Sequence, residues 1–184
     1  MLKDIESEIE NIISKSQVPE DPIHSKNTRD WVLKLKPEAD IALQIAALGH
    51  DIERSVKERK IKRENFTDYD EFKRAHSQNS AIILQEILRK YELNQNFIDK
   101  VVHLVLLHEF GGGLEANILK YADSISFFDV NLPYYFQRHS ERETVFRMKW
   151  GYKKLSEVGK SIVRNFSYDN DDLEALFRKI ILQN

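Results

Sequence analysis

Apolar residues recur at intervals of three and four along most of the chain, which is the period of an α-helix. No convincing stretch alternates between apolar and polar residues, as a half-buried strand would. The pattern therefore predicts an all-α protein, a single-domain bundle of about eight helices. The expected helices cover residues about 3–16, 23–35, 38–52, 68–91, 95–109, 114–129, 140–165 and 170–182.

Local signals mark where several of these helices begin and end. Asp21 before Pro22 is expected to be an N-cap followed by a first-turn proline. Residues 67–70 and 140–143 have the pattern of capping boxes. The three glycines at 111–113 are expected to end the helix before them.

Two connecting segments are expected to lack helix. Residues 54–66 are crowded with Lys, Arg and Glu, which favours an exposed loop. The Asn-Leu-Pro sequence at 131–133 predicts a turn. By contrast, residues 38–52 are rich in Ala, Ile and Leu, so that helix is expected to be buried on nearly all sides.

The composition narrows the class of protein. A chain of 184 residues with 41% hydrophobic and 32% charged residues can form one well-packed domain. The net charge of −2 gives no general attraction to nucleic acid. The absence of cysteine excludes disulfides and thiolate metal sites. With neither a signal peptide nor an apolar run long enough to cross a bilayer, we expect a cytoplasmic protein with no membrane or nucleic-acid partner.

Four predicted helices carry a polar residue on an otherwise apolar stripe: His24, His76, His108 and Asp123. A lone buried histidine is usually a core residue that hydrogen-bonds to a backbone carbonyl. A buried carboxylate is harder to explain, because its burial is costly unless a cation lies beside it. One metal site would account for all four residues together.

His50 and Asp51 follow an apolar run at the end of the expected helix 38–52. Adjacent residues on a helix point about 100° apart, so both side chains reach one ion only near a helix end. Gly49 is expected to give the backbone freedom at this point. Neutral imidazole with carboxylate suits Mn, Fe, Co, Ni or Zn better than Ca, which prefers oxygen ligands.

In this order on successive helices, these residues resemble the His…His-Asp…His…His…Asp motif of the HD superfamily of metal-dependent phosphohydrolases. The contexts of His76 (Ala-His-Ser before an aliphatic run) and Asp123 (Leu-Lys-Tyr-Ala-Asp) resemble that family as well. The resemblance covers about residues 20–130. It implies one HD-type domain over 1–184, with a C-terminal helical extension at 131–184 packed on the core.

The resemblance implies that one or two divalent ions bind, with Mn, Fe, Co, Ni, Zn and Mg as the candidates. Six residues would bind them: His24, His50, Asp51, His76, His108 and Asp123. Asp51 would bridge two ions, the second of which would be completed by His76 and His108. His103 is an alternative to His108, but its helix neighbours are polar, so we favour His108.

The implied activity is that of an enzyme that hydrolyses a phosphate ester of a nucleotide or similar small molecule with a metal-activated water. Asp51, Glu53 and Arg54 are the candidate catalytic residues, and a guanidinium such as Arg54 matches phosphate geometry. Arg29, Lys73 and Arg74 lie close to the proposed ligands in the sequence, so we expect them near the substrate. Glu109 is a further carboxylate that could orient a water. Solvated charge at a helix end is an equally good interpretation of Glu53, Glu109 and Arg54.

Two other functions fit the same residues. An HD-type di-iron oxygenase uses the same ligand set, and a non-catalytic metal-binding helical module would keep the histidines for structure. The aromatic and basic segment 131–166 could close over a base or sugar, but we favour a packing helix with a surface for homodimer formation. His139 in this segment is expected to be a surface residue.

Overall fold

The computed structural model describes residues 1–182 and confirms an all-α fold, with no strand in that range. The α-helices are α1 (Leu2–Ile13), α2 (Asp21–Leu35), α3 (Ile41–Gly49), α4 (Tyr69–Leu88), α5 (Gln95–Leu107), α6 (Leu114–Ser126), α7 (Leu132–Arg138), α8 (Glu141–Lys154), α9 (Glu157–Arg164) and α10 (Asp171–Phe177). Two 3-10 turns, η1 (Ile52–Ser55) and η2 (Arg63–Asn65), follow α3, and two π-helical turns, η3 (Phe127–Asn131) and η4 (Arg178–Leu182), follow α6 and α10. None of the described helices is long and apolar enough to cross a membrane.

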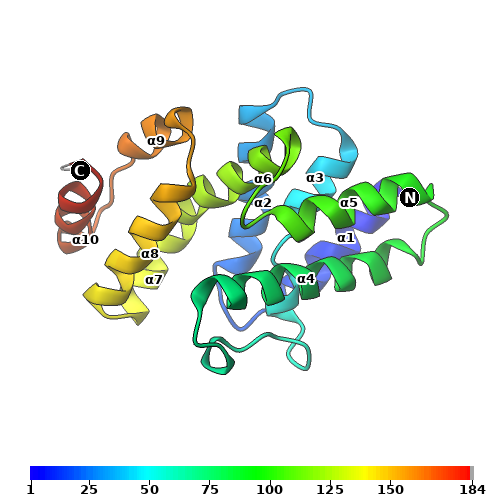
Figure 1. Ribbon diagram of the computed structural model, residues 1–184, viewed down its shortest axis with the longest axis horizontal. Helices are drawn as coiled ribbons and strands as arrows, with labels where there is room; N and C mark the ends of the chain where they lie inside the picture. The colour runs from blue at the N-terminus through cyan, green and yellow to red at the C-terminus, as the bar shows by residue number, and fades with distance from the viewer. Residues whose placement is uncertain (183–184) are drawn as a thin grey trace.

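The helices pack in a continuous series along the long axis of the molecule (Figure 1). α3 packs against both α2 and α5, α4 packs against α5, and α2 packs against α6. The N-terminus lies at the end formed by α1, α4 and α5, whereas the C-terminal helices α8 to α10 form the opposite end (Figure 1). α2 and α6 therefore lie between the two ends.

Buried apolar residues form two clusters that meet at α2. The first cluster takes its residues from Ile5 to Ala122, and the second takes its residues from Ile125 to Ile181. The partly buried side chains of Trp31 and Leu35 pack against both clusters. α2 thus holds the N-terminal and the C-terminal helices together, which matters because the candidate site lies between these two groups of helices.

The predicted capping box at 140–143 is confirmed, but two other predictions about helix starts are wrong. The box predicted at 67–70 does not form, because the N-cap of α4 is Asp68, whose side chain accepts the Glu71 N–H. The side chains of Asp68, Asn94 and Ser140 each accept a backbone hydrogen bond at the start of a helix, and Ser140 takes part in a complete capping box. The prediction for Asp21 is wrong, because the N-cap of α2 is Glu20 and makes no side-chain cap bond. The Asp21 carboxylate instead accepts a hydrogen bond from Ser16 Oγ at 2.5 Å.

Two predictions about the C-terminal half are also wrong. Residues 131–133 do not form a turn, because the chain continues through η3 into α7 with Pro133 in the first helical turn, where its missing N–H costs nothing. The single long helix expected over 140–165 is two helices. α8 ends at Lys154, and the Ser156 side chain accepts the backbone N–H of Gly159 to begin α9.

The helix that carries the His-Asp pair is shorter than predicted. α3 begins after Asp40, whose carboxylate accepts the Leu43 N–H at 3.0 Å, and it ends at Gly49. Gly49 does not have a positive φ, unlike Gly111 and Gly112, so backbone freedom is not its role. A Cβ at Gly49 would lie 3.0 Å from both methyl carbons of Leu84, so the glycine leaves room for the end of that side chain.

Candidate metal centre

The end of α3 brings two adjacent side chains to the same place. His50 is the C-cap of α3, with φ −57° and ψ −34°, and Asp51 follows with φ −105° and ψ 15°. The helix therefore stops between the two residues, and His50 Nε2 lies 3.7 Å from Asp51 Oδ1. This agrees with the sequence argument that a His-Asp pair shares a site only at a helix end.

Four imidazoles converge near this point, and each of them is held through Nδ1. The Nδ1–H groups of His50 and His108 donate to the carbonyl oxygens of Ala47 and Val105, at 2.8 and 2.7 Å. Nδ1 of His24 lies 2.8 Å from Ser126 Oγ, whose hydroxyl donates to the backbone carbonyl of His24. Nδ1 of His76 lies 2.6 Å from Glu53 Oε1. Because Nδ1 is used in each case, Nε2 is the nitrogen left for a metal.

Two carboxylates complete the cluster. Asp51 Oδ1 lies 2.6 Å from His76 Nε2 and 3.7 Å from His108 Nε2. Asp123 Oδ1 lies 3.3 Å from His24 Nε2 and 3.5 Å from His50 Nε2. The structure thus brings together all six residues that the sequence proposed as metal ligands, from α2, the end of α3, α4, the end of α5 and α6.

The spacing of these atoms suits a divalent transition ion. Atoms bound about 2.0–2.2 Å from one ion lie about 3.0–3.5 Å from each other. Nε2 of His24 lies 3.2 Å from Nε2 of His50, and both nitrogens lie within 3.5 Å of Asp123 Oδ1. Nε2 of His108 is buried and has no hydrogen-bond partner among residues 1–182. The cluster can therefore hold a metal ion, and its nitrogen-rich donor set favours a transition metal over Ca.

The donors fall into two groups that share Asp51. One group contains His24, His50 and Asp51, and the other contains Asp51, His76, His108 and Glu109. Within each group the donor atoms lie within 4.8 Å of one another. This sharing is compatible with one ion or with two ions bridged by Asp51.

Glu109 follows His108 as Asp51 follows His50, so it forms a second His-acid pair at the cluster. The sequence suggested it only as a carboxylate that could orient a water. His108 is the C-cap of α5, as His50 is of α3, and the acidic residue follows directly in both cases. Glu109 is buried and pairs with two ammonium groups, those of Lys73 and Lys154. Lys154 Nζ lies 2.7 Å from Glu109 Oε2 and 3.3 Å from Asp123 Oδ2.

The cluster strongly perturbs the ionisation of its members. Burial alone would raise the pKa of Asp51, but the neighbouring imidazoles and Arg54 hold it well below its ordinary value. Burial alone would likewise raise the pKa of Asp123, but Lys154 and two imidazoles lower it far more. Burial would lower the pKa of His50, yet the carboxylates of Asp51 and Asp123 raise it to about 9. In the metal-free protein, positive charge on the imidazoles thus balances these carboxylates.

Glu53 and Arg54 both lie at the cluster. Glu53 is buried, and its second oxygen, Oε2, accepts the Ile61 N–H at 2.7 Å, so the carboxylate links His76 to the loop before α4. Arg54 lies 2.7 Å from Asp51 Oδ2 and 3.2 Å from Asp21 Oδ1. Burial would lower the pKa of Arg54, but these two carboxylates raise it, so the guanidinium remains charged.

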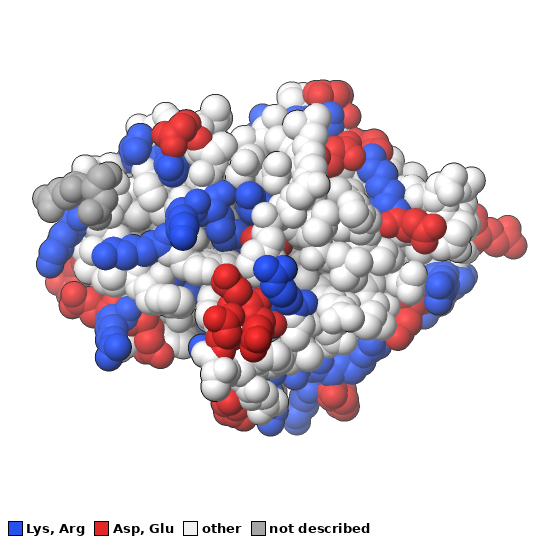
Figure 2. Space-filling view, in the orientation of Figure 1, with Lys and Arg blue, Asp and Glu red and all other residues white. Residues whose placement is uncertain are grey.

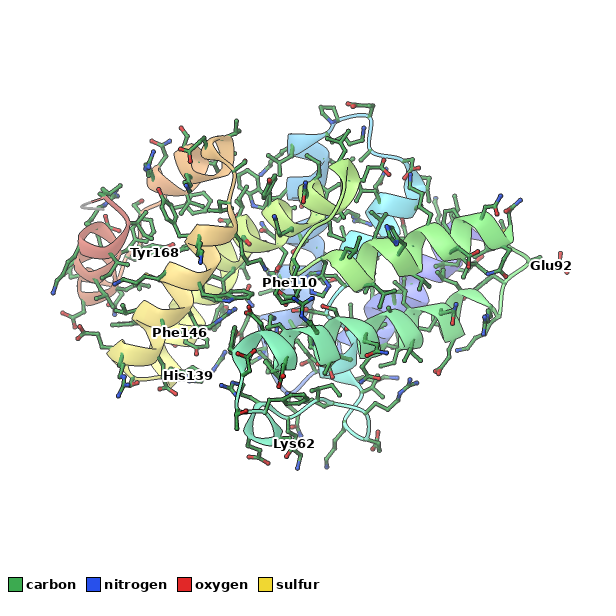
Figure 3. All side chains as sticks on the ribbon, in the orientation of Figure 1. Lys62, Glu92, Phe110, His139, Phe146 and Tyr168 are labelled. Carbon is green, nitrogen blue, oxygen red and sulfur yellow. The ribbon has the colours of Figure 1, made fainter. Side chains whose placement is uncertain are left out.

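A cavity of about 960 Å³ opens directly above the cluster. His24, Asp51, His76 and Asp123 line one part of it. The rest is lined by the loop before α4, the first turns of α4, and segments η3, α7 and α8. Figure 3 shows Lys62 in that loop and His139 and Phe146 on the side of α7 and α8, and all three line the cavity.

The structure does not bring every predicted substrate residue to this cavity. Arg29 and Arg74 are not among its lining residues. Arg29 pairs with Glu6 at 3.6 Å, and the Arg74 guanidinium lies 4.1 Å from the centre of the Phe110 ring. We therefore no longer place these two arginines at the substrate. Arg54 and Lys73, in contrast, line the cavity.

The structure also shows where His103, His139 and helix α8 lie in relation to the cluster and the cavity. His103 is exposed, whereas His108 is buried in the cluster, as the polar neighbours of His103 suggested. His139 is exposed at the surface, but it stacks on Tyr135 with ring centres 3.9 Å apart and lines the cavity. α8 is more than a packing helix, because Arg147, Trp150 and Lys154 also line the cavity.

Lysine and arginine side chains gather on the outer surface over α8 and α9 in the view of Figure 2. These charges lie on the part of the molecule that covers one side of the cavity. Acidic side chains gather beside them in the same view, so this face carries both signs of charge.

A family model described as a domain of unknown function (DUF4202) matches residues 4–176. The chain belongs to the DUF4202 family. No curated protein and no solved structure matches the chain. The segment matched by the DUF4202 model contains the whole histidine and aspartate cluster as well as Arg147 and Lys154 of α8. The description of the family names no activity, so the function is inferred from the site itself.

Proposed function

We propose that this protein is a metal-dependent phosphohydrolase of the HD type, which hydrolyses a phosphate ester of a nucleotide or similar small molecule. The observation that carries the proposal is the convergence of His24, His50, Asp51 and Asp123 on one point at the base of the cavity. Their order along the chain, together with His76 and His108, resembles the HD motif. The ligand set that this resemblance implies is compatible with the geometry of the cluster.

The residues around the cluster suit an anionic substrate. Arg54, Lys73 and Lys154 all line the cavity beside the candidate ligands. When bound, a divalent cation would lower the pKa of a coordinated water and offset negative charge on a phosphate. The side chain of Arg54, which remains charged, would hold a phosphate oxygen near Asp51. The Glu53 carboxylate contacts Nδ1 of His76 and so positions that imidazole. Glu53 would therefore act through His76 rather than on the substrate.

This cationic lining favours phosphate chemistry over oxygen chemistry. A di-iron oxygenase with the same ligands would need three ammonium or guanidinium groups beside the metal only if its organic substrate were an anion, whereas a phosphate ester is always one. Each of these cations has a carboxylate partner, so their charge is balanced in the metal-free protein. A phosphate that binds with a metal ion would add negative charge as the metal adds positive charge. The net charge of the site would therefore change little.

The test begins with elemental analysis of protein purified without chelators, followed by a screen of phosphomonoesters and phosphodiesters with Mn, Fe, Co, Ni, Zn and Mg. We expect metal-dependent release of phosphate or of an alcohol, and its loss in Asp51→Ala. Oxygen consumption with iron-loaded protein is measured in parallel. Substrate-dependent oxygen uptake without phosphate ester turnover would replace the proposal with an oxygenase.

A further inference from the structure

The cations that line the cavity differ in whether a carboxylate balances them. Arg54, Lys73 and Lys154 are partly buried, and each pairs with at least one carboxylate. Arg147 is also partly buried and lines the same cavity, but no carboxylate of the described residues lies within 4.0 Å of it. An arginine removed from water normally has an anion beside it. Lys60, Arg63 and Arg142 also line the cavity without such a partner, but they are exposed to water. Among the partly buried cavity cations of the described residues, Arg147 is therefore the one without a carboxylate.

The residues around Arg147 hold its guanidinium in place but accept only some of its N–H hydrogen bonds. Nη1 donates a hydrogen bond to Tyr69 Oη at 2.6 Å, whereas a guanidinium has five N–H donors. The rings of Phe127 and Trp150 lie 4.8 and 5.2 Å from the Arg147 Cζ atom. These aromatic contacts stabilise the cation and restrict its movement. The remaining N–H groups are free to bind a ligand in the cavity.

Trp150 connects Arg147 to the candidate metal centre. Lys154 Nζ lies 4.4 Å from the centre of the Trp150 ring, and Lys73 Nζ lies 5.7 Å from it. Lys154 in turn contacts Asp123, one of the candidate ligands. Arg147 and Lys154 therefore contact the same indole ring, so the guanidinium lies beside the cations of the candidate metal centre. The cavity volume of about 960 Å³ is large enough for a molecule the size of a nucleotide.

We propose that Arg147 binds a second anionic group of the substrate, so that the ligand of this site is an organic diphosphate rather than a monophosphate. The first phosphate lies at the metal centre and the second accepts hydrogen bonds from the guanidinium of Arg147. This inference rests on the proposed function for the position of the first phosphate. To that proposed function, the inference adds the class of substrate and the residue that would select it.

The test compares a ligand that has one phosphonate group with two ligands that have two such groups. None of the three contains a P–O–P bond that could be hydrolysed. Methylphosphonate, methylenediphosphonate and an α,β-methylene nucleoside diphosphate are titrated into the Mn-loaded full chain by calorimetry. One fixed total metal concentration is used, so that chelation in solution is the same for every variant. Arg147→Gln is expected to weaken both diphosphonates by about tenfold or more, because a charge-assisted bidentate contact is lost. Methylphosphonate affinity should change by less than about threefold.

Matched variants separate this role from a structural one. Lys153→Gln removes an exposed cation from the same helix and should leave all three affinities unchanged. Arg147→Lys keeps the charge but loses the guanidinium fork, so its diphosphonate affinity should lie between wild type and Arg147→Gln. If Arg147→Gln does not fold, Tyr69→Phe removes only the hydroxyl that holds Nη1 and should weaken the diphosphonates selectively.

The outcomes also separate this inference from the proposed function. Equal losses for mono- and diphosphonates in Arg147→Gln, or no loss, would overturn the second anion site even if phosphate esters are turned over. A loss confined to the nucleoside ligand would overturn the assignment of Arg147 to phosphate. Selective loss of diphosphonates without any turnover of phosphate esters by the wild type would support the anion site and count against the phosphohydrolase.

Discussion

Nε2 of His24 and Nε2 of His50 face each other at 3.2 Å in the interior of the protein. The Nδ1 atom of each ring is a hydrogen-bond donor, to Ser126 Oγ and to the Ala47 carbonyl. In the neutral rings, both Nε2 atoms would therefore direct lone pairs at each other, which is unfavourable unless a proton or a metal ion lies between them. Asp123 Oδ1 lies within 3.5 Å of both nitrogens, so a cation at this point would have three donors.

Removal of metal should therefore destabilise the fold. A ligand that binds only the native state adds about 2.7 kcal/mol of stability at a hundredfold excess over its dissociation constant. For a domain of this size, that corresponds to a fall of about 5–10 °C in the melting temperature after chelation. Differential scanning fluorimetry with chelator, followed by addition of Mn, Fe, Co, Ni or Ca, tests this. We expect the transition metals to restore the melting temperature more fully than Ca, and a melting curve indifferent to both treatments would favour structural core histidines.

Single-ligand variants should lose metal according to their position in the cluster. Asp51→Ala removes the carboxylate shared by both donor groups, so we expect loss of most bound metal and of any activity. His108→Ala should remove metal from the second group only. His103→Ala is the matched control, because His103 is an exposed histidine of the same helix. Elemental analysis of the three variants checks this order, and metal loss in His103→Ala without loss in His108→Ala would contradict it.

Ser126 should contribute to metal affinity without touching the metal. Its hydroxyl fixes the Nδ1 side of His24, and loss of such an outer hydrogen bond typically weakens metal binding by about 10–100-fold. Ser126→Ala should therefore lower affinity by about this factor while the fold is kept. Ser124→Ala is the control, because Ser124 Oγ is buried on the same helix but has no hydrogen-bond partner in the described chain. Competition titrations with a metallochromic chelator measure both affinities, and equal losses in the two variants would argue against the role of Ser126.

Helical periodicity explains which parts of the site were predictable. His76 was found because it interrupts the apolar face of its helix. The same period distinguishes the two cations before it. Lys73 is three residues away, about 60° around the helix from His76, and lines the cavity, whereas Arg74 is two residues away and points to another side. Proximity in sequence was thus the wrong criterion for Arg74, and position on the helix would have separated it from Lys73.

Other parts of the site depend on tertiary packing that no local pattern contains. Lys154 reaches Asp123 only because α8 packs against α6, and nothing in the sequence of α8 indicates this contact. The cap at Ser156 divides the helix predicted over 140–165 and so determines where Lys154 lies in relation to the end of α8. The all-α class was predictable because the helical period extends over most of the chain. The division into a core of 20–130 and an extension stays a prediction.

Asp40 should stabilise α3, and thereby the His-Asp pair, in a pH-dependent way. Burial would raise the pKa of Asp40, but Lys100 and the backbone N–H groups of α3 lower it below its ordinary value. The ionised form is therefore favoured in the folded protein. The resulting stability is present above the ordinary aspartate pKa of about 3.9 and is lost as the pH falls through the lower folded value.

Two variants separate the cap of α3 from its charge. Asp40→Ala should lose about 1 kcal/mol of stability at neutral pH, because an N-cap is removed. Asp40→Asn keeps a cap without a titrating group, so it should lose less and should show a smaller dependence of stability on pH between 5 and 2 than the wild type. Urea unfolding across this range measures both effects, and an identical pH dependence in wild type and Asp40→Asn would contradict the assignment.

Lys154 should make metal binding and stability depend on each other. Its ammonium group balances both Glu109 and Asp123, and Lys154→Met would leave Asp123 with only imidazole partners in the metal-free protein. Breaking one side of a buried ion pair typically costs about 3–5 kcal/mol, so we expect the metal-free variant to be destabilised by about this amount.

A bound divalent ion would offset the charge of Asp123 in place of the ammonium. The stabilisation on adding saturating Mn should therefore be larger in Lys154→Met than in wild type. Lys153→Met is the control, since Lys153 is exposed on the same helix, and thermal melts of the three proteins with and without Mn give the six values needed. An equal metal-induced shift in wild type and Lys154→Met would show that Lys154 and the ion do not balance the same carboxylate.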